Sequence, residues 1–94
     1  MPEMTLQTLR AEIDAIDEQI IHLLAKRFAV TRQVGQLKAR NALPSVDAER
    51  ESAQQLRYRQ LALANDIDPA LVTGMFRAVI EEVVRQHRDQ RDLA

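Results

Sequence analysis

A row of apolar residues with heptad spacing runs through the first third of the chain and constrains its fold more than any other feature. The residues follow one another at alternating steps of three and four. We call this row the seam: Leu6, Leu9, Ile13, Ile16, Ile20, Leu23, Val30, Val34 and Leu37. Such spacing places every member on one face of an α-helix. The seam therefore predicts one long helix, from about Thr5 to Arg40.

One position of the seam carries a charge. Between Leu23 and Val30 the pattern requires an apolar residue, and the chain has Arg27. A guanidinium stays protonated at any ordinary pH, and its burial without an anion is costly. Arg27 is therefore expected to meet an anion. That anion is either a carboxylate of a partner helix, which would fix the register of the pair, or a bound ligand.

The length of the predicted helix indicates a partner for the seam. The chain has 94 residues, and a compact monomer of this length has a diameter of roughly 30–35 Å. A helix from Thr5 to Arg40 is about 50 Å long, so it would leave part of its apolar face exposed. A second copy of the same chain is the simplest cover, and the seam thus predicts a homodimer.

Two further helices are expected after the first. Pro44 interrupts the helical pattern, so Ser45 or Asp47 is expected to cap a second helix that runs to about Ala64. Asp68 followed by Pro69 predicts the start of a third helix, which continues to about Arg88. The polar tail from Arg88 to Ala94 is expected to fray.

The two later helices differ in their apolar residues. The second has a thin set, Ala48, Ala53, Leu56, Leu61 and Leu63. The third is richer, with Leu71, Val72, Met75, Phe76, Val79, Ile80, Val83 and Val84. One line of the third helix leads through Val79 and Val83 to His87. The sequence predicts an all-α fold of three helices, organised as a single domain over residues 1–94.

Composition excludes several classes of protein. The chain has no cysteine, which removes disulfides and thiolate chemistry and fits the cytoplasm. A net charge of −1 argues against general nucleic-acid binding. We expect no signal peptide and no membrane span, since the chain has no long apolar stretch. We also expect no metal site and no cofactor, since the chain has two histidines and no glycine-rich phosphate loop.

Two further cations stand near Arg27 on the predicted first helix. Lys38 lies eleven residues after Arg27, about three turns along and about 20° round the helix, so the two share a face. Long side chains that lean toward each other can bracket a small dianion. Arg10 lies at the edge of the seam, and in an intertwined dimer it can reach the middle of the other first helix. Taken alone, Arg10 is best interpreted as a surface arginine, and many pairs like that of Arg27 and Lys38 are only solvated.

A few polar residues of the later helices are also candidates. Asp47, Arg50 and Glu51 share one face in the first turn of the second helix, where the simpler interpretation is a cap with an i to i+4 partner. His87 continues an apolar line, where a histidine is more often a satisfied core residue than a catalytic one. Its imidazole can also serve as a donor near neutral pH. Cations, carboxylates and a histidine suit electrostatic stabilisation of a dianion without covalent catalysis.

The order and spacing of these residues resemble the all-helical class of chorismate mutases. The resemblance rests on Leu9-Arg10 with Ile13 and Ile16-Asp17, on Leu24-Ala25-Lys26-Arg27, on Val34-Gly35 before Lys38, on Pro44 and Asp47-Ala48-Glu49-Arg50-Glu51, and on Phe76 with Ile80-Glu81. It implies an intertwined homodimer of three-helix chains. It also implies an isomerase that converts chorismate to prephenate by an intramolecular rearrangement, without a cofactor, in aromatic amino-acid or related biosynthesis.

The resemblance also implies roles for individual residues. Arg27, with Arg10 of the other chain, would hold the side-chain carboxylate, and Lys38 would contact the ether oxygen and a carboxylate. Glu51, with the backbone near Asp47, would bind the ring hydroxyl. Arg50 would line the same pocket.

Two positions depart from the pattern of the family. Val83 replaces a serine that often helps to bind the ring carboxylate, and His87 replaces a glutamine that commonly donates to the ether oxygen. These changes leave open isochorismate-pyruvate lyase or 4-amino-4-deoxychorismate mutase activity on the same scaffold. Glu51 favours a mutase over a lyase, but accepts from an amine as well as a hydroxyl. A non-enzymatic helical dimerisation module is the competing class.

Overall fold

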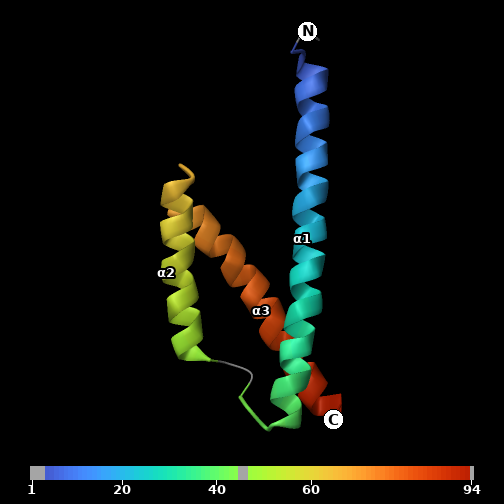
Figure 1. The fold of residues 1–94 in the computed structure, drawn as a ribbon, viewed down its shortest axis with the longest axis vertical. Helices are drawn as coiled ribbons and strands as arrows, with labels where there is room; N and C mark the ends of the chain where they lie inside the picture. Colours follow the sequence, from blue (N-terminus) through green and yellow to red (C-terminus); the bar gives the residue numbers. More distant parts are fainter. Residues whose placement is uncertain (1–3, 45–46, 94) are drawn as a thin grey trace. The chain divides into compact units, whose positions relative to one another are not determined.

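Three helices make up the secondary structure of the chain. The structure, a computed structural model, describes residues 4–44 and 47–93, with side chains up to Asp89. The helices are α1 (Leu6–Arg40), α2 (Ala48–Ala64) and α3 (Pro69–Leu93), and no strand occurs in the described ranges (Figure 1). The all-α class and the three-helix order are thus confirmed. None of the helices in these ranges is long and apolar enough to cross a bilayer.

The beginnings of the helices follow from side-chain caps. Thr5 caps α1: its Oγ1 accepts from the Thr8 N–H at 3.1 Å, and the Thr5 N–H donates to Oγ1 of Thr8 at 2.9 Å. Asp47 caps α2 by accepting from the Arg50 N–H at 3.0 Å, and Asp68 accepts from the Ala70 N–H at 3.0 Å at the start of α3. These bonds satisfy donors that the first turn of a helix leaves open. The alternative cap Ser45 lies outside the described residues.

The carboxyl ends of α1 and α2 are built in the same way. At the end of α1 the Leu43 N–H donates to the Lys38 carbonyl at 2.8 Å, and at the end of α2 the Ile67 N–H donates to the Ala62 carbonyl at 2.9 Å. The residue before each donor, Ala42 or Asp66, has a φ of 55°. This is the Schellman arrangement, in which a left-handed residue reverses the chain and an apolar residue follows. Neither left-handed position is a glycine.

The end of α3 differs from the prediction. The helix continues to Leu93, beyond the expected end at about Arg88. No glycine or proline stands between Arg88 and Leu93 to end the helix, and arginine and glutamine are good helix formers.

The chain divides into two units, which we describe separately: Met1–Thr31 and Arg32–Ala94. In the first unit the described residues belong mainly to the early turns of α1, and none of them is buried. The seam residues from Leu6 to Leu23 are 39% to 65% exposed. A single helix has no second element on which to bury its apolar face, so the seam of this unit has no cover.

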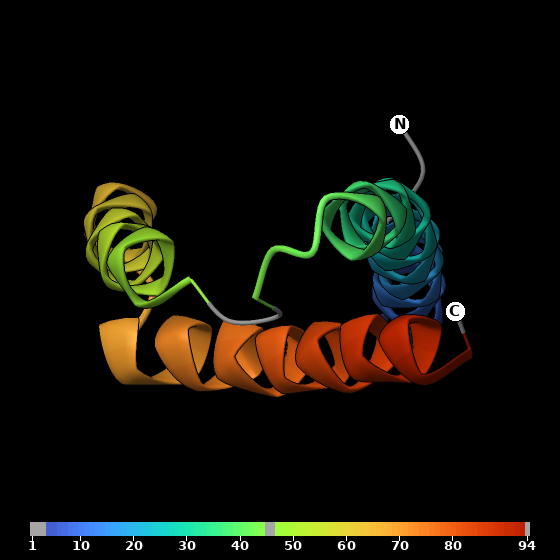
Figure 2. The ribbon, with the colours of Figure 1, turned by 90° about the horizontal axis from the view of Figure 1, so that it is seen from below.

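In the second unit α2 packs against α3 as an antiparallel pair. The two helices meet at the turn between Ala64 and Pro69 and diverge away from it (Figures 1 and 2). Near the turn the rings of Tyr58 and Phe76 stack, with 4.1 Å between their centroids and 13° between their planes. Tyr58, Ala62 and Val83 are the buried apolar residues of the described chain.

The inward face of α2 is not the one expected from its apolar residues. Leu56, Leu61 and Leu63, which belong to the thin apolar set of this helix, are exposed in the single chain. Tyr58 and Ala62 are buried instead, one turn apart, and Glu51 lies on the same face. In α3 the line through Val79, Val83 and His87 turns inward as predicted, whereas Leu71 and Met75 are exposed.

Candidate active site

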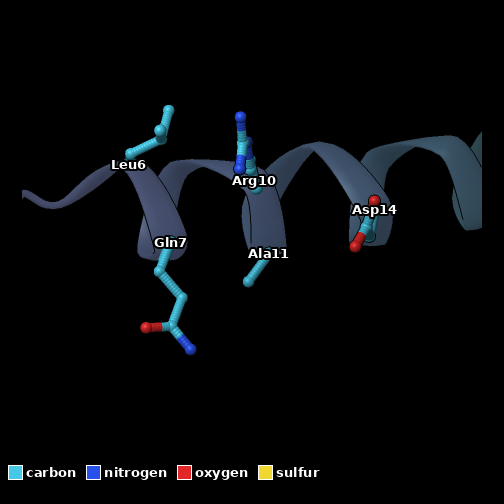
Figure 3. A pocket seen from close by; sticks show the side chains of 5 residues that line it. All are labelled: Leu6, Gln7, Arg10, Ala11 and Asp14. Carbon is cyan, nitrogen blue, oxygen red and sulfur yellow. The ribbon is translucent and has the colours of Figure 1, made fainter.

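The cations of α1 lie in different surroundings. Arg10 is exposed and borders an open hollow on the first turns of the helix, together with Leu6, Gln7, Ala11 and Asp14 (Figure 3). One helix alone lines this hollow, and in Figure 3 the Arg10 side chain points away from that of Gln7. Among the described residues Arg10 has no hydrogen bond or ion pair. An arginine in this position is available to a group outside the unit.

Arg27 and Lys38 are both half-buried. They lie on the same uninterrupted helix, as the sequence predicted. Lys38 is in the last turn, where its ammonium also suits the negative end of the helix dipole. Within the described part of the chain no side-chain partner satisfies Lys38. Its charge is therefore free to neutralise an anion that the chain itself does not supply.

The first turn of α2 positions two carboxylates differently. Asp47 is exposed and is used as the helix cap, which fixes the start of α2. Glu51 lies one turn further on, is half-buried, and accepts no hydrogen bond from the residues that the structure describes. Arg50 is exposed. Glu51 is thus the carboxylate of this group that faces inward and remains able to accept from a ligand.

Among the residues of α3 whose side chains are described, Val83 and His87 are the most enclosed. Val83 is 9% exposed and His87 is 4% exposed, so the two lie one turn apart on the same inward face. The neighbouring charges point elsewhere: Arg85 forms an ion pair with Glu82 at 2.5 Å on the outer side. The Arg85 hydrogen bond lowers the pKa of the Glu82 carboxyl, and a hydrogen bond from Gln86 lowers it further.

The second unit contains most of the predicted site. Lys38, Asp47, Arg50, Glu51, Val83 and His87 belong to it, whereas Arg10 and Arg27 belong to the first unit. The assembly of all eight residues into one site therefore stays a prediction. In the described ranges no cluster of histidine, cysteine, aspartate or glutamate side chains is arranged to hold a metal ion.

Two residues of the inward face of α2 were missed from the sequence. Gln54 and Gln55 follow Glu51 at steps of three and four, and both are half-buried. The signal was present, since the spacing from Glu51 through Gln54 and Gln55 to Tyr58 is that of one helix face.

Comparison with known proteins identifies the family. The family model for chorismate mutase type II matches residues 9–88. The chain belongs to this family.

Individual members are similar over most of the chain. The "Chorismate mutase" of Methanocaldococcus jannaschii is 32% identical over 76 residues, which are 81% of this chain and 77% of that protein. The T-protein of Enterobacter agglomerans is 34% identical over 85 residues, which are 90% of this chain and 23% of the relative. The T-protein of Haemophilus influenzae is 38% identical over 81 residues, or 86% of this chain and 19% of the relative.

The lengths of these relatives differ from that of this chain. The chain spans about a fifth of the length of the first curated relatives it matches. The region that the family model matches includes all of α2, and all of α1 and α3 except their ends. All the candidate site residues from Arg10 to His87 therefore fall within the part that the family model describes.

Proposed function

We propose that this chain is a chorismate mutase that rearranges chorismate to prephenate. The observation that carries the proposal is the family match over residues 9–88, with Arg27, Lys38 and Glu51 half-buried at the positions singled out from the sequence. In the reaction, the ether bond between the ring carbon and the enolpyruvyl oxygen breaks while the enolpyruvyl methylene forms a carbon–carbon bond to the ring. No proton or electron is exchanged with the protein.

The proposed mechanism is electrostatic. Arg27 holds the side-chain carboxylate and orients the enolpyruvyl group over the ring, which lowers the entropic part of the barrier. Lys38 donates to the ether oxygen, where negative charge develops as the bond breaks. Glu51 accepts from the ring hydroxyl, while the Asp47 cap fixes the turn that presents Glu51. Arg50 lines the pocket, and His87 donates to the ether oxygen from α3.

The proposal includes an intertwined homodimer. The seam of the first unit is exposed from Leu6 to Leu23, and a second α1 is an apolar surface of matching length. Arg10, which is exposed, would then enter the site of the other chain and bind the side-chain carboxylate together with Arg27. The cytoplasmic location expected from the composition remains a prediction.

Two alternative activities use the same scaffold. An isochorismate-pyruvate lyase is disfavoured by Glu51, while a mutase of 4-amino-4-deoxychorismate would use Glu51 to accept from the amine. A non-enzymatic dimerisation module is the alternative of a different class. In that class Arg27→Leu would be tolerated and would even stabilise the dimer, because a buried charge is replaced by an apolar group.

The test is the consumption of chorismate by the purified protein, followed by its absorbance, with the product identified as prephenate, salicylate or neither. Arg27→Leu is expected to lower kcat/KM about 100-fold or more with an intact fold. Lys26→Leu is the matched control, since Lys26 is the exposed neighbour of Arg27. Salicylate as the product, or full activity of Arg27→Leu, would contradict the proposal.

A further inference from the structure

The inward face of α2 is polar in the half that lies away from the turn to α3. Ala62 and Tyr58, nearest the turn, are buried. Gln54, Gln55 and Glu51, further from the turn, are half-buried. The intervening residues on the other side of the helix, such as Ala53 and Leu56, are exposed. The structure thus turns three polar side chains inward and leaves apolar ones outside.

The amides of Gln54 and Gln55 are not used inside the chain. Within the described residues neither side chain has a hydrogen bond, although both are shielded from much of the solvent. Both amides are therefore able to donate to another molecule that approaches this face of α2.

The facing helix supplies no polar partner at this level. The Tyr58–Phe76 stack fixes the register of the antiparallel pair. The turn of α2 before Tyr58 therefore corresponds to the turn of α3 after Phe76, which presents Val79 and then Val83 inward. Valine side chains neither donate nor accept. The two helices also diverge in this direction (Figure 1).

We infer that Gln54 and Gln55 bind the ring carboxylate of the substrate through their side-chain N–H groups. The inference rests on the proposed function. A dianionic substrate bound by Glu51 at its ring hydroxyl needs a donor for the carboxylate at the opposite position of the ring. That donor must be neutral or positively charged, because a second carboxylate side chain of the protein would repel the carboxylate of the substrate.

The spacing along α2 fits this arrangement. Gln54 and Gln55 lie three and four residues after Glu51, which is about 4.5–6 Å along the helix axis. That span is comparable with the separation of two substituents at opposite positions of a six-membered ring. The two amides therefore supply on α2 the hydrogen bonds that α3 lacks at Val83.

The experiment compares the double variant Gln54→Leu/Gln55→Leu with Gln60→Leu, the same change at an exposed position on the outer side of α2. Leucine is as good a helix former as glutamine, so the fold is retained. The double variant is expected to raise KM for chorismate about tenfold or more, with kcat changed much less, because hydrogen bonds to a charged group are lost. Gln60→Leu should leave both constants unchanged.

Two further measurements separate ligand binding from packing. Gln54→Glu/Gln55→Glu keeps the size of the side chains but replaces donors by anions, so its KM should exceed that of the leucine variant. A chorismate analogue with the ring carboxylate esterified should bind wild type and the leucine variant within twofold of each other, because the contact is already absent. A leucine variant with wild-type KM for chorismate, or an equal penalty with the ester, would overturn the inference.

The proposed function is tested separately by the wild-type protein. Wild-type turnover of chorismate together with unaffected glutamine variants would remove the role of the amides alone. Absence of wild-type turnover would remove the proposed function and the inference with it.

Discussion

The rings of Tyr58 and Phe76 stack at 4.1 Å and join α2 to α3 in a core that otherwise contains few buried side chains. Tyr58→Ala should therefore lower the free energy of unfolding by about 3 kcal/mol, because it removes a buried aromatic ring and leaves a cavity. Urea denaturation followed by circular dichroism measures the change. Tyr58→Phe keeps the ring and should cost less than about 1 kcal/mol; equal losses in the two variants would show that the hydroxyl, not the stack, is responsible.

The cap of α2 gives a second prediction. Asp47→Ala removes the acceptor of the Arg50 N–H and should destabilise the protein by about 1 kcal/mol. Asp47→Asn retains an oxygen acceptor at the same place and should stay within a few tenths of wild type. The midpoint of urea unfolding distinguishes them. Similar midpoints for the alanine and asparagine variants would mean that the cap contributes little.

The left-handed residue after α1 gives a prediction of opposite sign. Ala42 has a φ of 55°, a conformation that disfavours a residue with a Cβ and suits glycine. Ala42→Gly should raise the free energy of unfolding by about 0.5–1 kcal/mol. Ala29→Gly, in the middle of α1, should lower it by about 1 kcal/mol. Thermal unfolding of the two glycine variants tests this difference in sign. If Ala42 is not left-handed in solution, both variants should be less stable than the wild type.

The proposed exchange of Arg10 between chains predicts complementation. Arg10→Ala and Arg27→Ala should each be nearly inactive. After unfolding and refolding together in equal amounts, half of the dimers are mixed and each mixed dimer has one intact site of two, so the mixture should recover about a quarter of wild-type activity. A mixture no more active than its components would mean that Arg10 acts within its own chain.

His87 gives the pH prediction. If the imidazolium is the required donor to the ether oxygen, kcat/KM gains on the acid side, and His87→Gln flattens that gain because the amide carries no charge. The pH–rate profiles of the wild type and of His87→Gln, measured over the pH range in which both proteins remain folded, test this prediction. Identical profiles would remove this role.

Much of the fold could be predicted from periodicity and caps. The bounds of α1 and the starts of α2 and α3 follow from Thr5, Asp47 and Asp68, because helix starts depend on local hydrogen bonds. The inner face of α2 could not be predicted from its leucines. Burial there is decided by the ring of Phe76 on another helix, which selects Tyr58 over Leu56.

The candidate site was predicted unevenly for a similar reason. Arg27 and Lys38 stand out because charges interrupt or flank an apolar row, and Glu51 follows a recognisable cap. Gln54 and Gln55 do not interrupt a row of apolar residues, because the preceding residue on the same face of α2, Glu51, is also polar. Only the inward orientation of Tyr58 reveals that the two glutamines face the same way.

The lack of buried residues in the first unit has a consequence for amide hydrogen exchange. If a second chain covers the seam, the backbone hydrogens between Leu6 and Thr31 are protected only while two chains are associated. Their exchange should then accelerate as the protein is diluted, whereas the exchange of α2 around Tyr58 should not depend on concentration in the same way. Amide exchange in the early turns of α1 would then report on the dissociation of the subunits.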